Sequence, residues 1–193
     1  MMRIITGKAR GIRLKTLEGD ATRPTAERVK EAVFSMLQYD IEGREVLDLF
    51  AGSGQLGLES VSRGAKVAVL VDKSRDALKI IEENVARTKL SDCCEIHRAD
   101  ALDFIQRYKS RKFDIVFLDP PYASGLYVPV LKALVHCGLL KTGAVVVCES
   151  DTEGLFGDDT ALQNLFTVKK QSKYSRTVIT VLALAESEAE DEQ

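Results

Sequence analysis

The sequence has no apolar run as long as a membrane span, and its first residues lack the apolar core of a secretory signal. It contains only two histidines, and its four cysteines are not spaced as metal ligands. These absences disfavour membrane proteins, secreted proteins and proteins built around a metal. We therefore expect a cytoplasmic protein without a metal site, whose cysteines are buried free thiols.

The sequence also shows no internal repeat and no second domain, and 193 residues suit one α/β domain with a full core. Its net charge is only −2, which by itself argues against nucleic acid as a partner. That value hides an asymmetry, because residues 1–30 contain eight basic and three acidic residues, a net charge of +5. A basic amino-terminal face is suited to a phosphate backbone.

Residues 3–17 predict a small β-hairpin. Ile12 and Leu14 flank Arg13, so apolar and basic side chains alternate as they do on the two faces of a strand, and glycines permit the turn. One face would be apolar and the other basic. On the basic face, Arg10 and Arg13 are candidate contacts to RNA phosphates.

Composition divides the chain into three segments. We expect a basic hairpin or arm over residues 1–24 and a main domain over residues 25–185, whose first helix has Thr25 as its N-cap. Residues 186–193 contain five acidic residues and no basic one, which is typical of a disordered, solvating tail.

The run Phe113–Leu118 is almost entirely apolar and predicts a strand buried on both faces. Asp119, Pro120, Pro121 and Tyr122 follow it directly. Because proline has no N–H to offer a neighbouring strand, the strand must end there. A carboxylate, a rigid turn and an aromatic ring are thus placed at the carboxyl end of a core strand, where ligands bind in open α/β sheets.

These groups suit chemistry on an exocyclic base amine, such as N2 of guanine or N6 of adenine. Such an amine is a poor nucleophile, because its lone pair is delocalised into the ring. The Asp119 carboxylate and the Pro120 carbonyl can accept its hydrogens and stabilise the positive charge that grows on nitrogen during attack. Tyr122 would stack on the base, which is worth about 1–3 kcal/mol.

A second motif lies earlier, where a short apolar strand runs into Gly52, Gly54 and Gly57 in the pattern G-x-G-x-x-G. Such glycines let the backbone approach a ligand at a helix N-terminus. Asp72 ends the next predicted strand, 20 residues after Gly52, and can accept hydrogen bonds from both ribose hydroxyls of a nucleoside. This pattern fits NAD as well as S-adenosylmethionine. Asp48 favours the latter, because a carboxylate there suits a positively charged methionine end and would be poorly placed beside a pyrophosphate.

The order of the predicted elements defines the fold class. Five strand–helix units are followed by a polar loop over residues 151–164 and by two strands, Phe166–Lys170 and Thr177–Leu184, joined by too few residues for a parallel crossover. We expect an α/β, Rossmann-like fold with a seven-stranded, mostly parallel sheet and an antiparallel terminal strand. This is the layout of class I S-adenosylmethionine-dependent methyltransferases, here with the small amino-terminal β-hairpin extension.

With these motifs in order, the sequence resembles the class I amino-methyltransferases. Two amino-terminal segments, Arg3–Gly11 and Thr22–Phe34, look like those of the RsmD family, and the resemblance runs from Met2 to about Leu184. It implies methyl transfer from S-adenosylmethionine to N2 of one guanine in bacterial 16S rRNA. The family often has Tyr-Gly near the last hairpin where this chain has Tyr174 and Ser175, so the role of residues 172–176 stays open.

The resemblance also implies roles for individual residues. The implied catalytic residues are Asp119, Pro120 and Tyr122. The implied cofactor-binding residues are Asp48, Ala51, Gly52, Ser53, Gly54, Asp72, Lys73, Asp100, Ala101 and Asp119. The implied and charge-based substrate contacts are Arg10, Arg13, Arg23, Pro24, Thr25 and Tyr122.

Three alternatives remain open. Adenine-N6 methylation of DNA or RNA uses the same tetrapeptide, although a DNA enzyme needs a target-recognition segment for which this chain has little room. A non-catalytic assembly factor that binds rRNA is disfavoured by the intact Asp119–Tyr122 motif, and a nicotinamide oxidoreductase by Asp48. We expect a monomer that acts on 16S rRNA within a small-subunit particle and that binds neither a membrane nor a metal.

Overall fold

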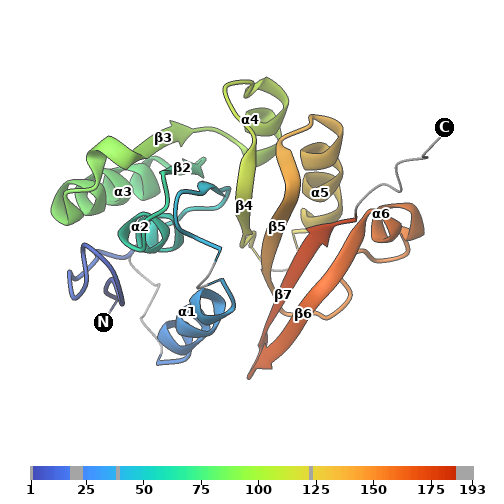
Figure 1. Cartoon of the computed structure of the whole chain (residues 1–193), viewed down its shortest axis with the longest axis horizontal. Coiled ribbons are helices and arrows are strands. Elements are labelled where there is room, and N and C mark those ends of the chain that lie inside the picture. Colours follow the sequence, from blue (N-terminus) through green and yellow to red (C-terminus); the bar gives the residue numbers. More distant parts are fainter. Residues whose placement is uncertain (1, 18–23, 38–39, 122–123, 186–193) are drawn as a thin grey trace.

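The computed structural model describes residues 2–17, 24–37, 40–121 and 124–185, and for residues 24–26 it describes the backbone alone. Figure 1 shows the helices and strands of this part of the chain. In chain order they are α1 (Pro24–Met36), β1 (Glu45–Asp48), α2 (Gln55–Ser62), β2 (Val67–Asp72), α3 (Arg75–Thr88), η1 (Ser91–Cys93), β3 (Cys94–Arg98), α4 (Ala101–Arg107), β4 (Phe113–Leu118), α5 (Tyr127–His136), β5 (Leu140–Ser150), α6 (Thr160–Asn164), β6 (Phe166–Tyr174) and β7 (Thr177–Leu184).

The seven strands form one sheet in the order β3-β2-β1-β4-β5-β7-β6. The five strands β1 to β5 are parallel, whereas β7 is antiparallel to β5 and β6 is antiparallel to β7. Tyr174 pairs with Thr177, so the last two strands form a tight hairpin. The predicted α/β, Rossmann-like fold with an antiparallel terminal pair is confirmed.

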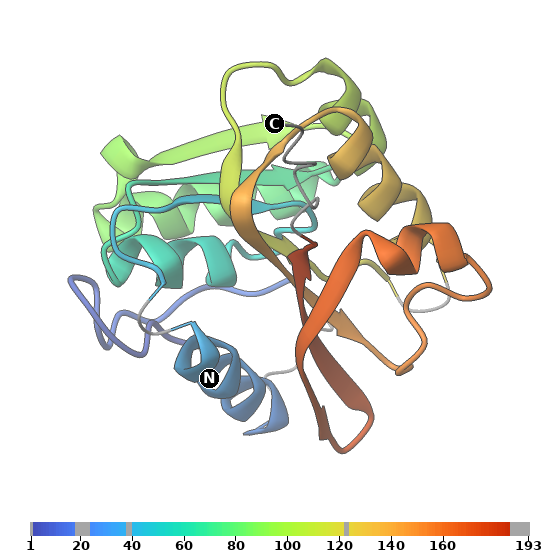
Figure 2. The same cartoon turned by 45° about the vertical axis from the view of Figure 1, so that its right-hand side comes forward.

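Helices cover both faces of the sheet, as Figures 1 and 2 show. The core on one face contains residues of α1, α2 and α3, for example Val33, Leu58 and Ile81. The core on the other face contains residues of α4, α5 and α6, for example Ile105, Leu131 and Leu162. The central strands are therefore covered twice, which explains their continuous apolar sequences.

Strand β4 shows how the pleat directs the residues that follow it. Ile115 and Phe117 belong to the core beneath α1 to α3, whereas Val116 and Leu118 belong to the core beneath α4 to α6. Side chains alternate along a strand, so a residue two positions after Phe117 points to the same face as Phe117. Asp119 is therefore directed toward α1 and α2.

The predicted amino-terminal hairpin is wrong in part. Arg3 and Arg13 form one antiparallel bridge and the Ile4 N–H donates to the Ile12 carbonyl at 2.9 Å, but residues 6–11 form bends and turns, and no regular strand is made. These turns pack on the end of α2, where the Lys8 N–H donates to the Ser62 carbonyl at 2.8 Å. A Cβ at Gly7 would lie 1.7 Å from that carbonyl oxygen, so the close approach requires glycine.

Glu59 of α2 fastens this segment to the domain. Its carboxylate is completely buried and accepts hydrogen bonds from the Ile5 N–H at 2.8 Å, the Thr6 N–H at 3.0 Å and Arg63 Nε at 2.9 Å. The buried Lys30 Nζ lies 3.5 Å from the same carboxylate and donates to the Arg3 carbonyl. We call these five residues with Arg3 the Glu59 clamp.

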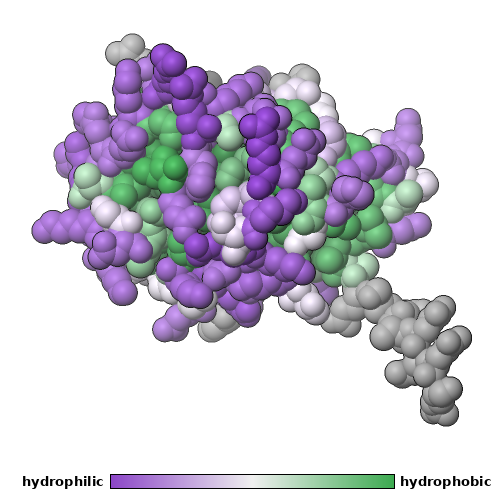
Figure 3. Space-filling view, turned by 90° about the horizontal axis from the view of Figure 1, so that it is seen from above, coloured by the Kyte–Doolittle hydropathy of each residue, from purple (hydrophilic) through white to green (hydrophobic). Residues whose placement is uncertain are grey.

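The molecule is mostly hydrophilic on the face shown in Figure 3, where apolar side chains form separate patches. Leu165 and Val168 are the large apolar side chains exposed among the described residues, at 43% and 49%. In the described part of the chain, no helix has both the length and the apolar character needed to cross a membrane.

Three local expectations differ from the structure. The first helix begins at Pro24, so Thr25 lies within its first turn instead of capping it. The segment expected to be a polar loop contains the short helix α6. All four cysteines are free as expected, but only Cys148 is buried.

Candidate active site

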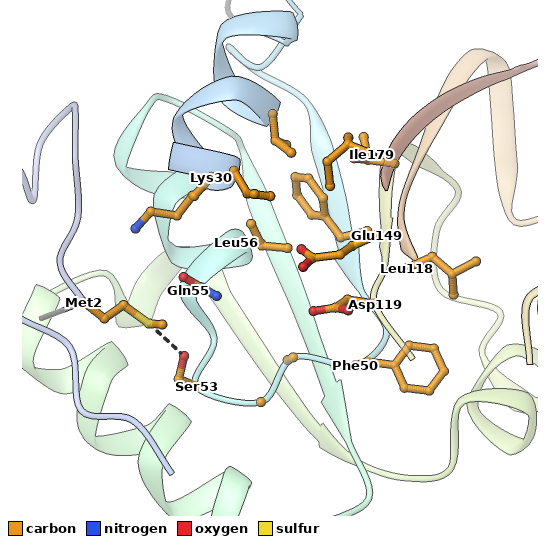
Figure 4. Close-up of a pocket in the computed structure, with 16 residues that line it drawn as sticks. Met2, Lys30, Phe50, Ser53, Gln55, Leu56, Leu118, Asp119, Glu149 and Ile179 are labelled. Atoms are coloured by element: carbon orange, nitrogen blue, oxygen red, sulfur yellow. Dashed lines mark hydrogen bonds between the residues drawn. The ribbon is translucent and has the colours of Figure 1, made fainter. Parts of the chain in front are cut away.

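Two adjoining cavities lie at the carboxyl ends of β1, β2, β4 and β5. The first has a volume of about 400 Å³ and contains Asp72, and we call it the Asp72 cavity. The second has a volume of about 240 Å³ and contains Glu149, and we call it the Glu149 cavity (Figure 4). Phe50, Gly52 and Asp119 line both. A ligand that spans the two cavities must therefore pass Asp119.

The glycine loop between β1 and α2 has the geometry that its sequence predicts. Gly52 and Gly54 have φ of 53° and 76°, in the left-handed region that favours glycine. A Cβ at Gly52 would meet no atom within 4 Å, so this backbone is open to a ligand. A Cβ at Gly57 would lie 2.1 Å from Leu70 Cδ2, so glycine allows α2 to pack closely on β2.

The loop is held in place from three directions. The Ala51 N–H donates to the Val71 carbonyl at 3.0 Å, and the Ser53 carbonyl accepts from Asn84 Nδ2 of α3 at 2.9 Å. Ser53 Oγ donates to Met2 Sδ at 3.4 Å (Figure 4). Ala51 and Ser53, both predicted cofactor residues, line the Glu149 cavity together with Met2, which the sequence reasoning did not single out.

Asp48 lies beneath the loop and is only 2% exposed. Its carboxylate accepts a hydrogen bond from the Gly57 N–H at 3.2 Å, which ties β1 to the first turn of α2. Burial raises the pKa of Asp48 to about 7, and the nearby negative charge of Asp72 adds to this effect. Asp48 is not among the residues that line the two cavities, so its contact with a cofactor stays a prediction.

Asp72 joins the glycine loop to the start of α3. Its Oδ2 accepts from the Gly52 N–H at 2.9 Å, and its Oδ1 accepts from the Ser74 N–H at 2.8 Å. Each oxygen keeps a further lone pair, so the carboxylate can still accept hydrogen bonds from a ligand in the cavity. Lys73 lies beside it in the same lining.

Asp100 and Ala101 lie across the Asp72 cavity, at the start of α4. Asp100 is the N-cap of this helix, and its Oδ1 accepts from the Leu102 N–H at 3.0 Å. The side chain is exposed while Ala101 is buried. Asp100, which follows the end of β3, thus faces the same cavity as Asp72.

Strand β4 ends at Leu118, as the following prolines require. Asp119 is half-buried at the junction of the two cavities, and Pro120 is buried in the wall of the Asp72 cavity. Tyr122 lies outside the described residues. The structure thus brings Asp119 and Pro120 together with the glycine loop and Asp72, while the role of Tyr122 stays a prediction.

Glu149 is a candidate functional residue that the sequence reasoning missed. Leu118 pairs with Cys148 in the parallel ladder of β4 and β5, so Asp119 and Glu149 follow paired residues. Figure 4 shows both carboxylates pointing into the Glu149 cavity. Burial raises the pKa of Glu149. The only sequence signal was an acidic residue directly after the apolar run that ends at Cys148.

The predicted substrate contacts lie on the amino-terminal part of the chain. Arg10 and Arg13 are exposed, and neither forms an ion pair with a carboxylate in the described residues. Pro24 and Thr25 lie in the first turn of α1, whose later residues reach the Glu149 cavity. Arg23 lies outside the described residues.

Comparison with known proteins identifies the family. The family described as Conserved hypothetical protein 95, which is the RsmD family, matches this chain over residues 2–183. The chain belongs to that family. Its fold is accordingly that of the S-adenosylmethionine-dependent methyltransferases.

Individual members of the RsmD family support this assignment. The chain is 36% identical over 152 residues to Ribosomal RNA small subunit methyltransferase D of Escherichia coli K12, covering 79% of this chain and 76% of the relative. It is 35% identical over 154 residues to the protein of the same name from Haemophilus influenzae, covering 79% and 80%. The solved structure of the candidate methyltransferase yhhF from Escherichia coli superimposes with a TM-score of 0.82 at 29% identity, covering 96% of this chain and 99% of that one.

The side chains present in this RsmD-family chain fit the family's cofactor. S-adenosylmethionine offers hydrogen-bond donors at its adenine and ribose, and the Asp72 cavity presents the acceptors Asp72 and Asp100. The cofactor carries a positive charge on its sulfonium, and the Asp119 carboxylate lies at the junction of the two cavities. Between them lies the bare backbone of Gly52.

Proposed function

We propose that this protein transfers a methyl group from S-adenosylmethionine to the exocyclic N2 of a guanine in 16S rRNA. The observation that carries the proposal is the position of Asp119 and Pro120, at the junction of two cavities in a member of the RsmD family. The relatives named as small subunit methyltransferases support rRNA as the substrate.

The cofactor would lie along the glycine loop, with its nucleoside in the Asp72 cavity. Asp72 would accept hydrogen bonds from the ribose hydroxyls and Asp100 from the adenine amino group, with Lys73 and Ala101 beside them. Asp48, Ala51, Ser53 and Gly54 would shape the loop that carries the methionine end. When bound, the cofactor supplies an electrophilic methyl group and takes back the electron pair of the carbon–sulfur bond.

Asp119 and Pro120 would prepare the amine for attack. The Asp119 carboxylate and the Pro120 carbonyl accept the two N2 hydrogens and hold the nitrogen so that its lone pair points at the methyl group. As the nitrogen–carbon bond forms, positive charge grows on N2 and Asp119 stabilises it. The proton then leaves to Asp119 or to water, so no stronger base is needed. Tyr122 would stack on the base.

The RNA would lie against the amino-terminal face. The exposed Arg10 and Arg13 would contact phosphates, and Arg23, Pro24 and Thr25 would border the entrance to the site. The guanine must be unpaired or flipped from its stack to reach Asp119. We propose that the protein acts as a cytoplasmic monomer on rRNA within a small-subunit particle.

Replacement of Asp119 tests the catalytic assignment. Asp119→Ala should lower kcat by about 10²–10³-fold and change KM far less, because the carboxylate stabilises charge only as the methyl transfers. Asp119→Asn keeps an acceptor oxygen without the charge and should fall between wild type and alanine. Tyr122→Phe should be nearly silent, whereas Tyr122→Ala should not. Full turnover by Asp119→Ala would show that this strand end is structural.

The assay measures methyl transfer from labelled S-adenosylmethionine to small-subunit particles from cells that lack the enzyme. Mass mapping of the 16S rRNA from such cells, with and without the restored gene, identifies the modified base. A methylguanine that returns with the gene supports the proposal. A methyladenine in its place would refute guanine as the target.

A further inference from the structure

We propose that Glu149 is the residue that selects guanine, by accepting a hydrogen bond from N1–H of the target base while Asp119 holds the neighbouring N2 amine. This inference rests on the proposed methyl transfer to guanine and adds the residue that decides between bases. Glu149 would recognise the base, whereas the transfer of the methyl group requires only Asp119 and Pro120.

The sheet places the two carboxylates side by side. Phe117 pairs with Val147 and Leu118 with Cys148, so Asp119 and Glu149 are the next residues on adjacent parallel strands. Phe117 and Val147 both face the core beneath α1 to α3, and side chains two residues further along point to the same face. Neighbouring strands lie about 4.8 Å apart, so the two carboxylates are close enough to converge on one edge of a base.

Glu149 is also held firmly. Its backbone pairs with Ile179 of β7, and its carbonyl accepts a hydrogen bond from the Tyr127 hydroxyl at 2.5 Å. Among the described residues, no group donates a hydrogen bond to its side-chain carboxylate, which points into the cavity in Figure 4. A half-buried acceptor on a rigid strand, facing the cavity, is suited to a donor that the ligand brings.

The chemistry of the two purines decides which ligand that is. Guanine presents N1–H beside N2, so its edge offers donors to two adjacent carboxylates. Adenine presents the bare N1 lone pair beside its N6 amine, so a second acceptor at that place finds no hydrogen to accept. Asp119 alone could hold either amine. Glu149 beside it makes the pair complementary to guanine and mismatched to adenine.

The lining of the cavity supports a flat, uncharged base. Val29 and Val33 of α1, with Leu56 of α2, form apolar walls, and Gln55 adds a neutral polar group. Lys30 also borders the cavity, but its Nζ is held by the Arg3 carbonyl and lies 3.5 Å from Glu59. Asp119 and Glu149 are therefore the acidic side chains that this lining offers to a base edge.

The test uses base analogues that keep the reacting amine. Small-subunit particles are reconstituted with 16S rRNA ligated to carry guanine, 2-aminopurine or 2,6-diaminopurine at the mapped position. Both analogues retain the N2 amine but have a lone pair in place of N1–H. Wild-type enzyme should prefer guanine by about 10- to 100-fold in kcat/KM, the usual discrimination of a matched polar pair.

Glu149→Gln identifies the residue responsible. Its amide can donate to the N1 lone pair, so the preference for guanine should fall below about 3-fold because the analogues are used better. The affinity for S-adenosylmethionine, measured by calorimetry, should stay within about 3-fold of wild type and also reports that the variant is folded. Glu153→Gln makes the same chemical change at an exposed position and should behave as wild type in both measurements.

Several results would overturn the inference. Equal use of guanine and both analogues by wild type would show that no group reads N1–H, whatever the variants do. An unchanged preference in a folded Glu149→Gln would assign the reading to another residue. A large loss of S-adenosylmethionine affinity with the preference intact would make Glu149 a cofactor ligand. No transfer to the guanine particle by wild type would instead refute the proposed function, and this inference with it.

Discussion

Replacing Glu59 by alanine should destabilise the protein by about 4 kcal/mol. The change removes the acceptor of the Ile5 and Thr6 N–H groups and leaves Lys30, 3% exposed, without its carboxylate. Breaking a buried ion pair costs about 3–5 kcal/mol, and each buried donor left unpaired costs about 1–3 kcal/mol. Because Thr6 is exposed and Arg63 only partly covered, water can replace some of these bonds, and the values do not add in full.

For a chain of this size, 1 kcal/mol corresponds to about 2–4 °C, so the midpoint of thermal unfolding should fall by about 8–16 °C. Circular dichroism is the suitable probe, because the chain has no tryptophan for fluorescence. Glu59→Gln keeps an acceptor oxygen but loses the charge, and it should fall between wild type and alanine.

Glu83→Ala provides the control. Glu83 forms an ion pair with Lys15 in which both side chains are about half exposed, and such pairs are worth less than about 1 kcal/mol. If Glu59→Ala and Glu83→Ala lowered the unfolding free energy equally, the Glu59 clamp would not hold the amino-terminal segment on α2.

Three further predictions concern the cofactor, a turn and the RNA. Burial holds the pKa of Asp48 near 7, and a positively charged ligand favours the ionised carboxylate. The affinity for S-adenosylmethionine should therefore rise as the pH rises to about 7, where Asp48 loses its proton. Calorimetry in buffers of different ionisation enthalpy should then detect proton release below that pH, which Asp48→Asn should abolish. Ser175 has φ of 59°, so Ser175→Gly should stabilise the protein by about 0.5–1 kcal/mol in thermal unfolding, and a loss of stability would contradict the strain argued from that angle. Replacing Arg10 and Arg13 with alanine should weaken RNA binding and leave cofactor binding intact. The slope of log K against log salt concentration should become shallower by up to about one unit per lost phosphate contact. An unchanged slope would mean that these two side chains do not contact RNA phosphates.

The sheet could be predicted from the sequence because its signals are local. The apolar run Phe113–Leu118 and the two prolines after it define a buried strand and its end without knowledge of the rest of the chain. Gly52 and Gly54 likewise report a backbone conformation that few other residues adopt. The antiparallel pairing of the last two strands could be predicted because their linker is short, although β6 runs to Tyr174 and not only to the predicted Lys170.

The parts that could not be predicted depend on contacts between distant residues. The amino-terminal hairpin was expected from alternation alone, but Gly7 and Lys8 pack on the end of α2 at Ser62. No local pattern of residues indicates that contact. Glu149 is a single acid after an apolar run, and only the register of β4 and β5 brings it beside Asp119.

The Glu59 clamp also has a consequence for synthesis of the protein. The Ile5 N–H reaches an acceptor that is 54 residues further along the chain, so it is made long before its partner. At about 5–20 residues per second, the ribosome needs roughly 3–11 s to add those residues. During that time the Ile5 N–H has no Glu59 carboxylate to bind, because Glu59 has not yet been added to the chain. The backbone of residues 3–6 is thus fixed only after α2 has been synthesised.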